Sequence, residues 1–185
     1  MSNFLDGITR PGHKPLANPT AHSPFRIQNR IKVAVVGPDG VTKKETPWLS
    51  NIMTTFGLAS LASRIGTSSG ANVNTTTEFV SAMKIGTGTQ AATSSDTSLV
   101  ASTGSVTIGN ASFTKTNAGN RTVSYRATFA SDNPAGAAQI NEVGLYLNST
   151  AESQCAARSV LGTASVNKGA SDTIQVSYDT VYTTA

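Results

Sequence analysis

The chain has 185 residues, which suits one domain of ordinary size with an extension. Only 13% of the residues are charged, roughly half the usual share, and small polar residues take their place. This composition argues against disorder, which accompanies high net charge and low hydrophobicity. No apolar stretch has the length of a signal peptide or a transmembrane helix, so we expect no membrane association and synthesis in a cytoplasm.

The formal net charge of +4 lies entirely in residues 1–47, and the remainder of the chain is neutral. A basic leading segment on a neutral body predicts docking on an acidic partner. A nucleic-acid site would show a denser cluster of basic residues with aromatics between them, so we expect an acidic protein surface and no nucleic acid. The predicted partner-binding residues are Arg10, Lys14, Arg26, Arg30, Lys32, Lys43, Lys44 and Trp48.

The N-terminal residues 1–25 predict an extended arm. Pro11, Pro15, Pro19 and Pro24 recur at nearly even spacing without apolar periodicity, and proline disfavours helix in itself and in the preceding residue. The two histidines of this segment have no carboxylate or cysteine nearby, so we expect no metal site.

Residues 26–48 predict a β-hairpin. Apolar residues alternate along its first strand, with a break in phase near residues 28–30, and Gly37–Gly40 (Gly-Pro-Asp-Gly) is a strong turn signal. Lys43 and Lys44 fit an exposed edge strand. Trp48 either contacts a partner or packs where the strand meets the next helix.

One helix is predicted, from Asn51 to Ile65, with Ser50 as its cap and Gly66 as its stop. Its apolar residues form a broad face that would pack on the body. Gly57 inside the helix costs roughly 1 kcal/mol relative to alanine.

The remainder reads as short strands with polar turns, which indicates an antiparallel arrangement. Both faces of residues 140–147 carry apolar groups, so this strand should lie in the middle of a sheet that is covered on both sides. The other expected strands are 79–85, 106–116, 122–129, 154–166 and 173–182, with a hairpin turn at 117–120.

We therefore predict a mainly β fold: an antiparallel β-sandwich, jelly-roll or immunoglobulin-like, with one packed α-helix and an extended N-terminal arm. The expected units are the arm at 1–25, the hairpin with the helix at 26–66, and the sandwich body at 67–185.

No set of residues predicts catalysis, a cofactor or a metal. Gly86 and Gly88 follow a strand, but neither a helix-opening glycine nor a phosphate-binding lysine follows, so a tight turn is the better interpretation. The single Cys155 excludes an internal disulfide and predicts a buried thiol. Glu142 is the one acid in an apolar strand. It could be exposed, catalytic, or paired with an arginine such as Arg126 or Arg158, and we favour the pair.

Several motifs occur in an order that resembles minor structural proteins of tailed-bacteriophage virions, such as tail-fibre, collar and baseplate proteins. The resemblance spans residues 28–182 and leaves the arm outside. Its segments are Val33–Gly40 (Val-Ala-Val-Val-Gly-Pro-Asp-Gly), Asn51–Ala62, Ile85–Thr89 (Ile-Gly-Thr-Gly-Thr), Ser95–Leu99 (Ser-Asp-Thr-Ser-Leu) and Ile140–Tyr146 (Ile-Asn-Glu-Val-Gly-Leu-Tyr).

The resemblance implies a non-enzymatic virion protein that forms a homo-oligomer, a trimer or a ring. Its partners would be neck, tail or capsid subunits, and its arm would attach near the neck, tail or fibre base. Two alternatives stay open: a capsid decoration (cement) protein that bridges capsomers, and a receptor- or carbohydrate-binding module. For the second alternative, the tyrosines lie within strands instead of clustering on loops, which argues against it.

Overall fold

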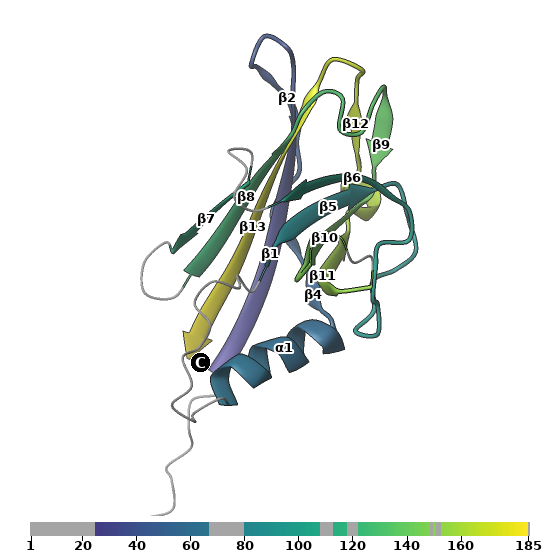
Figure 1. The fold of residues 1–185 in the computed structure, drawn as a ribbon. Coiled ribbons are helices and arrows are strands. Elements are labelled where there is room, and N and C mark those ends of the chain that lie inside the picture. Colours follow the sequence, from purple (N-terminus) through teal and green to yellow (C-terminus); the bar gives the residue numbers. More distant parts are fainter. Residues whose placement is uncertain are drawn as a thin grey trace, which may run out of the picture.

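The structure is a computed structural model, and it describes residues 25–66, 80–107, 113–117, 122–148, 150 and 153–184. The predicted arm lies outside these residues except for Phe25, which begins the first strand. The described chain is mainly β, with antiparallel sheets and one α-helix (Figure 1).

The larger sheet contains both the first and the last strand of the described chain. β1 and β13 pair antiparallel along all twelve residues, from Phe25 opposite Thr184 to Val36 opposite Thr173. The predicted hairpin is present, although β1 runs without a break where we expected one, because β13 holds it in a single register. The order is β2-β1-β13-β8-β7, with β3 also beside β1, and the bounds are β1 Phe25–Val36, β2 Thr42–Glu45, β3 Leu49–Ser50, β7 Phe113–Asn117, β8 Thr122–Phe129 and β13 Thr173–Thr184.

The second sheet places β10 in its middle, as the sequence predicted. All five residues of β10 are buried, because neighbouring strands flank it and side chains cover both of its faces. The order is β4-β11-β10-β5-β6, and the bounds are β4 Ile52–Met53, β5 Ala82–Gly86, β6 Ser102–Thr107, β10 Glu142–Tyr146 and β11 Cys155–Val160.

Each of three predicted strands is divided into two strands in the structure. Asn141 ends β9 (Ala138–Ile140) before β10 begins, because its backbone N–H and its side chain bind the carbonyls of Gly86 and Thr87. The expected strand at 106–116 contributes β6 to one sheet and β7 to the other, so the chain changes sheets there. The strand expected at 154–166 is β11, then the 3-10 helix η2 (Gly162–Ala164), then β12 (Val166–Lys168), which pairs with β9 in a separate two-stranded sheet.

The strand pairing of the predicted hairpin after β7 is confirmed, since β7 and β8 pair antiparallel from Asn117 opposite Val123, and turn residues 118–120 lie outside the described residues.

The helix α1 (Thr55–Gly66) begins four residues later than expected, because β4 pairs with β11 and occupies those residues. Its cap is Thr54 instead of Ser50: the Thr54 hydroxyl accepts the N–H of Gly57 at 3.0 Å. Gly57 lies directly against the carbonyl of Ala156 on β11. The helix packs at this glycine, whereas Phe56 and Leu58 on either side of it remain 39% and 48% exposed.

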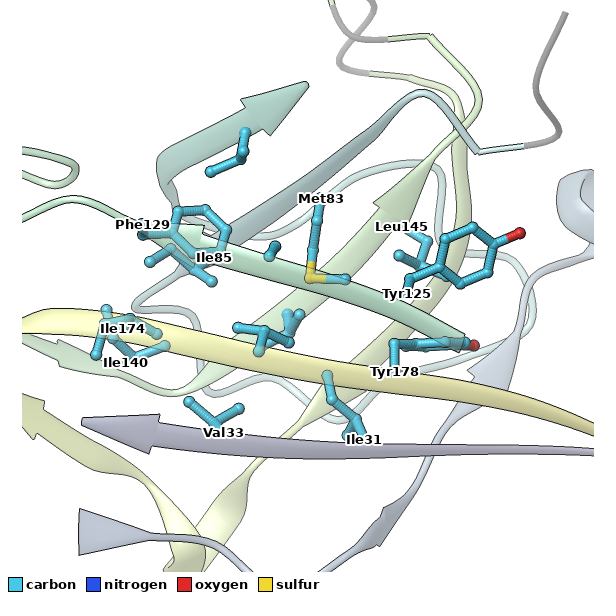
Figure 2. Close-up of a cluster of buried hydrophobic side chains, with 14 of the residues drawn as sticks. Ile31, Val33, Met83, Ile85, Tyr125, Phe129, Ile140, Leu145, Ile174 and Tyr178 are labelled. Carbon is cyan, nitrogen blue, oxygen red and sulfur yellow. The ribbon is translucent and has the colours of Figure 1, made fainter. Parts of the chain in front are cut away.

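Side chains from both large sheets form one hydrophobic core. Tyr125 and Tyr178, on adjacent strands, pack edge to face with their ring centroids 6.2 Å apart. Figure 2 shows this core, in which the labelled side chains are Ile31, Val33, Met83, Ile85, Tyr125, Phe129, Ile140, Leu145, Ile174 and Tyr178.

Candidate partner-binding face

Several of the predicted partner-binding residues lie on the solvent-facing side of the larger sheet. Ile31 and Val33 of β1 point into the core, so the even-numbered residues of this strand point outward. Arg26, Arg30 and Lys32 therefore lie on one face. We use the name basic face for these three residues together with Arg126 and Trp48.

Asp179 of β13 lies at the centre of the basic face and is nearly buried. Its Oδ2 is 3.1 Å from Nη2 of Arg30, and its Oδ1 accepts bonds from Arg126 Nη1 at 2.9 Å and from Ser124 at 2.7 Å. Burial opposes the ionised carboxylate, but these hydrogen bonds and charges outweigh burial and hold the pKa of Asp179 below its ordinary value. Two guanidinium groups thus share one carboxylate, which leaves excess positive charge here.

Trp48 lies against two of the three cations of β1. The guanidinium carbon of Arg30 is 4.5 Å from the ring centroid and Nζ of Lys32 is 5.6 Å from it. Lys32 also pairs with Glu45 at 2.9 Å. The ring therefore does not pack at the junction of strand and helix: it is 39% exposed on the sheet surface and restrains Arg30.

The other predicted residues are not part of this face. Lys43 and Lys44 lie on the edge strand β2, as expected, and both are bonded to the body. Nζ of Lys43 is 2.7 Å from Asp172, and Nζ of Lys44 donates to the carbonyl of Ser165 at 2.7 Å. The bond from Lys43 holds the pKa of Asp172 below its ordinary value. Arg10 and Lys14 lie outside the described residues.

Sequence reasoning missed Arg126, Ser124 and Asp179 as members of this surface. A signal was present, because Asp179 follows the core residue Tyr178 in an alternating strand and must point outward. The neighbours of Asp179 depend on strand register, which places Arg30 and Ser124 on either side of it.

The buried acid of β10 is paired with Arg158, one of the two arginines expected. Nε of Arg158 donates to Oε2 of Glu142 at 2.9 Å, and both side chains are almost fully buried. Oε2 also accepts the N–H of Val100 at 3.1 Å, and Oε1 accepts the N–H groups of Gly88 and Ala101 at 3.1 and 2.8 Å. Glu142 thus fastens both ends of the segment 87–101 to the sheet.

Arg158 fastens the middle of the same segment. Its Nη1 is 2.6 Å from Asp96 and its Nη2 donates to the carbonyl of Gln90 at 2.8 Å. Burial raises the pKa of Asp96, but the hydrogen bonds from Thr93 and Arg158 outweigh burial and the net pKa is lowered. A Cβ at Gly88 would collide with the carboxylate of Glu142, so this glycine permits the approach of an internal anion.

No protein-family model, no curated protein and no solved structure matches the chain. Among the described residues, no group of three or more His, Cys, Asp or Glu side chains could hold a metal ion. In that same part of the chain, no helix has the length and apolar character needed to cross a membrane.

Proposed function

We propose that the chain is a non-enzymatic structural protein of a tailed-bacteriophage virion. It forms a homo-oligomer, a trimer or a ring, and it attaches near the neck, tail or fibre base. The N-terminal arm and the basic face make the attachment.

The observation that carries this proposal is the meeting of separate motifs in one buried network. Gly88, Asp96 and Glu142 come from the three motifs Ile85–Thr89, Ser95–Leu99 and Ile140–Tyr146, and all bind directly to each other or to Arg158. Residues of the three motifs therefore share a structural role, because together with Arg158 they hold the segment 87–101 against the second sheet. A segment held in this way suits a rigid assembly component.

The proposal includes a β-sandwich body of jelly-roll or immunoglobulin-like type. Two features support it: the two large sheets share one core, and the chain changes sheets between β6 and β7.

The chemistry of the basic face fits an acidic protein surface. The side chains of Arg30 and Arg126 are 49% and 43% exposed although both also bind Asp179, so each can bind a second carboxylate. The stack on Trp48 holds Arg30 in place, which lowers the conformational entropy that binding would cost.

Immunogold labelling of intact particles with an antibody to residues 78–185 tests the assignment. Label confined to the neck or tail is the expected result. Label spread over the head would replace it with the decoration (cement) protein that bridges capsomers. Particles that lack the protein by mass spectrometry would contradict a virion role.

A further inference from the structure

Among the described residues, no strand pairs with one hydrogen-bonding edge of β1 near Ile27. The carbonyls of Val33 and Asn29 accept bonds from Thr46 and Asn51, away from β13, so odd-numbered residues of β1 direct their backbone groups to this edge. Along this edge β2 pairs with residues 34–36 and β3 with residues 30–31. In the described chain, no strand pairs with this edge at the residues of β1 that precede Asn29. The N–H and C=O of Ile27 point to this edge.

A hollow of ≈ 490 Å³ lies at the same end of β1 and extends across the sheet to β13 and β8. Its lining residues are Ile27, Gln28, Asn29, Arg30, Ser50, Asn51, Thr122 and Val181. The side-chain Oδ1 of Asn29 and both amide atoms of Asn51 are buried without a hydrogen-bond partner among the described residues. Unpaired buried amides are costly, so a ligand with backbone donors and acceptors would be stabilised here.

We propose that this edge receives an extended peptide strand, residues 2–9 of a second copy of this chain. An added strand would pair with Ile27 through its backbone and extend the larger sheet by one strand. The side-chain amides of Asn29 and Asn51 would bind further peptide groups of the added strand.

The sequence of the N-terminal segment identifies residues 2–9 as the occupant. They precede Pro11, so every one of them keeps the backbone N–H that strand pairing requires, whereas residues 11–24 contain four prolines. Asp6 is the only charged residue in this stretch, Arg26 precedes Ile27 on β1, and Arg30 lines the hollow. The charges are therefore complementary.

The prolines also favour a second copy over the same chain. β1 begins at Phe25, two residues before Ile27, which lines the hollow. A proline-rich chain extends by about 3.1 Å per residue, so residues 11–24 would span roughly 40 Å. A spacer of this length would allow residues 2–9 to reach the strand edge of a neighbouring copy.

This inference rests on the proposed function only in assigning the arm to assembly, and it names the surface that receives the arm. Its test uses the purified protein in solution, whereas the virion role is tested on particles, so the two can fail separately.

The test is amide hydrogen exchange at Ile27 in the full-length chain, measured with residue resolution at low and high protein concentration, with sedimentation velocity to give the oligomeric state. We expect the Ile27 amide to exchange at least about 100-fold more slowly in the assembled protein than in the diluted monomer.

Proline variants remove the donors on each side of the proposed pairing. The double variant Leu5→Pro/Asp6→Pro should abolish both protection and assembly. Successive residues of a strand direct their N–H groups to opposite sides, so one of these two residues must donate to the edge of β1. Ile27→Pro should abolish assembly, measured by sedimentation velocity because proline has no amide to exchange, without disturbing β13, since the N–H of Ile27 points away from it. The controls Leu5→Val/Asp6→Asn and Ile27→Val keep every backbone donor and should keep protection.

Three results would overturn the proposal: fast exchange at Ile27 in the assembled protein, protection that persists in the monomer, or assembly that survives the arm double variant. Protection in the monomer would show that the chain covers its own edge. If Ile27→Pro does not fold, the arm variant, which lies outside the described fold, still decides the question.

Discussion

Glu142 and Arg158 form an ion pair of 2.9 Å with side chains that are at most 1% exposed. They stand diagonally on neighbouring strands, because Arg158 lies opposite Gly144 in the register of β10 and β11. The pair lies under the segment 87–101, to which both side chains donate or accept hydrogen bonds. Each charge is compensated by the other and by backbone groups, which is the condition under which a buried ion pair is tolerated.

Removing the carboxylate should therefore destabilise the fold strongly. We expect Glu142→Gln to lower the free energy of unfolding by about 3 to 5 kcal/mol, because Arg158 would keep a buried charge with fewer partners. Urea unfolding followed by circular dichroism measures this.

The exposed pair between Lys32 and Glu45 is the matched control. Both side chains are partly solvated, at 29% and 48%, so Glu45→Gln should change stability by less than about 1 kcal/mol. Equal effects of the two variants would show that the buried pair is not what holds the segment 87–101.

Gly57→Ala should destabilise the protein although alanine favours helix. The new Cβ would collide with the carbonyl of Ala156, and moving the helix away should cost about 1 to 3 kcal/mol beyond the roughly 1 kcal/mol gained in helix propensity. Ala59→Gly is the control, because this exposed helix position should cost only about 1 kcal/mol. A stabilised Gly57→Ala variant would mean that α1 does not lie on β11 as described.

Local patterns predicted elements better than they predicted the limits of those elements. Alternation in β1 and β13 was visible in the sequence, and so was the buried character of β10. The start of α1 was not, because Asn51 and Ser50 are good capping residues and only the pairing of Ile52 with Arg158 on β11 excludes them. Tertiary pairing decided that boundary over local preference.

The candidate face was predicted in part for a similar reason. The sequence identified Arg30, Lys32 and Trp48, since the two basic residues and the tryptophan all lie in the expected hairpin. Asp179 lies 149 residues from Arg30 along the chain, and only strand order brings the two together. The pair of Glu142 could be predicted by charge alone, but choosing Arg158 over Arg126 needed the register.

The thiol of Cys155 should be unreactive in the folded protein. Burial raises its pKa to about 12, so hardly any thiolate is present near neutral pH. We expect a disulfide reagent at pH 8 to label Cys155 only as fast as the protein unfolds, and fully in urea. Leu99→Ala should speed labelling, because Leu99 packs in the same buried cluster. Fast labelling of the native protein would show that this cluster opens to solvent.

Stability should fall in acid through Asp179. Its pKa is lower in the folded protein than in the unfolded chain, so its contribution is complete above the ordinary value of about 3.9 and is lost as the pH falls below it. Asp179→Asn has no carboxylate to protonate and should lose less stability as the pH falls below about 4. Ser124→Ala, which removes one hydrogen bond to the carboxylate, should lie between the two. Parallel pH profiles for all three proteins would contradict this assignment.

Weakening the basic face should reduce incorporation into particles. The double variant Arg30→Gln/Trp48→Ala removes an exposed cation and the ring that restrains it. We expect the copy number of this variant per particle to fall at least about tenfold, since two central interface residues commonly contribute more than 1 kcal/mol each. Lys43→Gln is the control: it also removes a cation from an ion pair, but at the far end of the sheet, where β2 lies in Figure 1. Particles assembled with each variant can be compared by quantitative mass spectrometry, with circular dichroism confirming that the variants fold. Normal incorporation of the double variant would exclude the basic face as an attachment surface and leave that role to the arm.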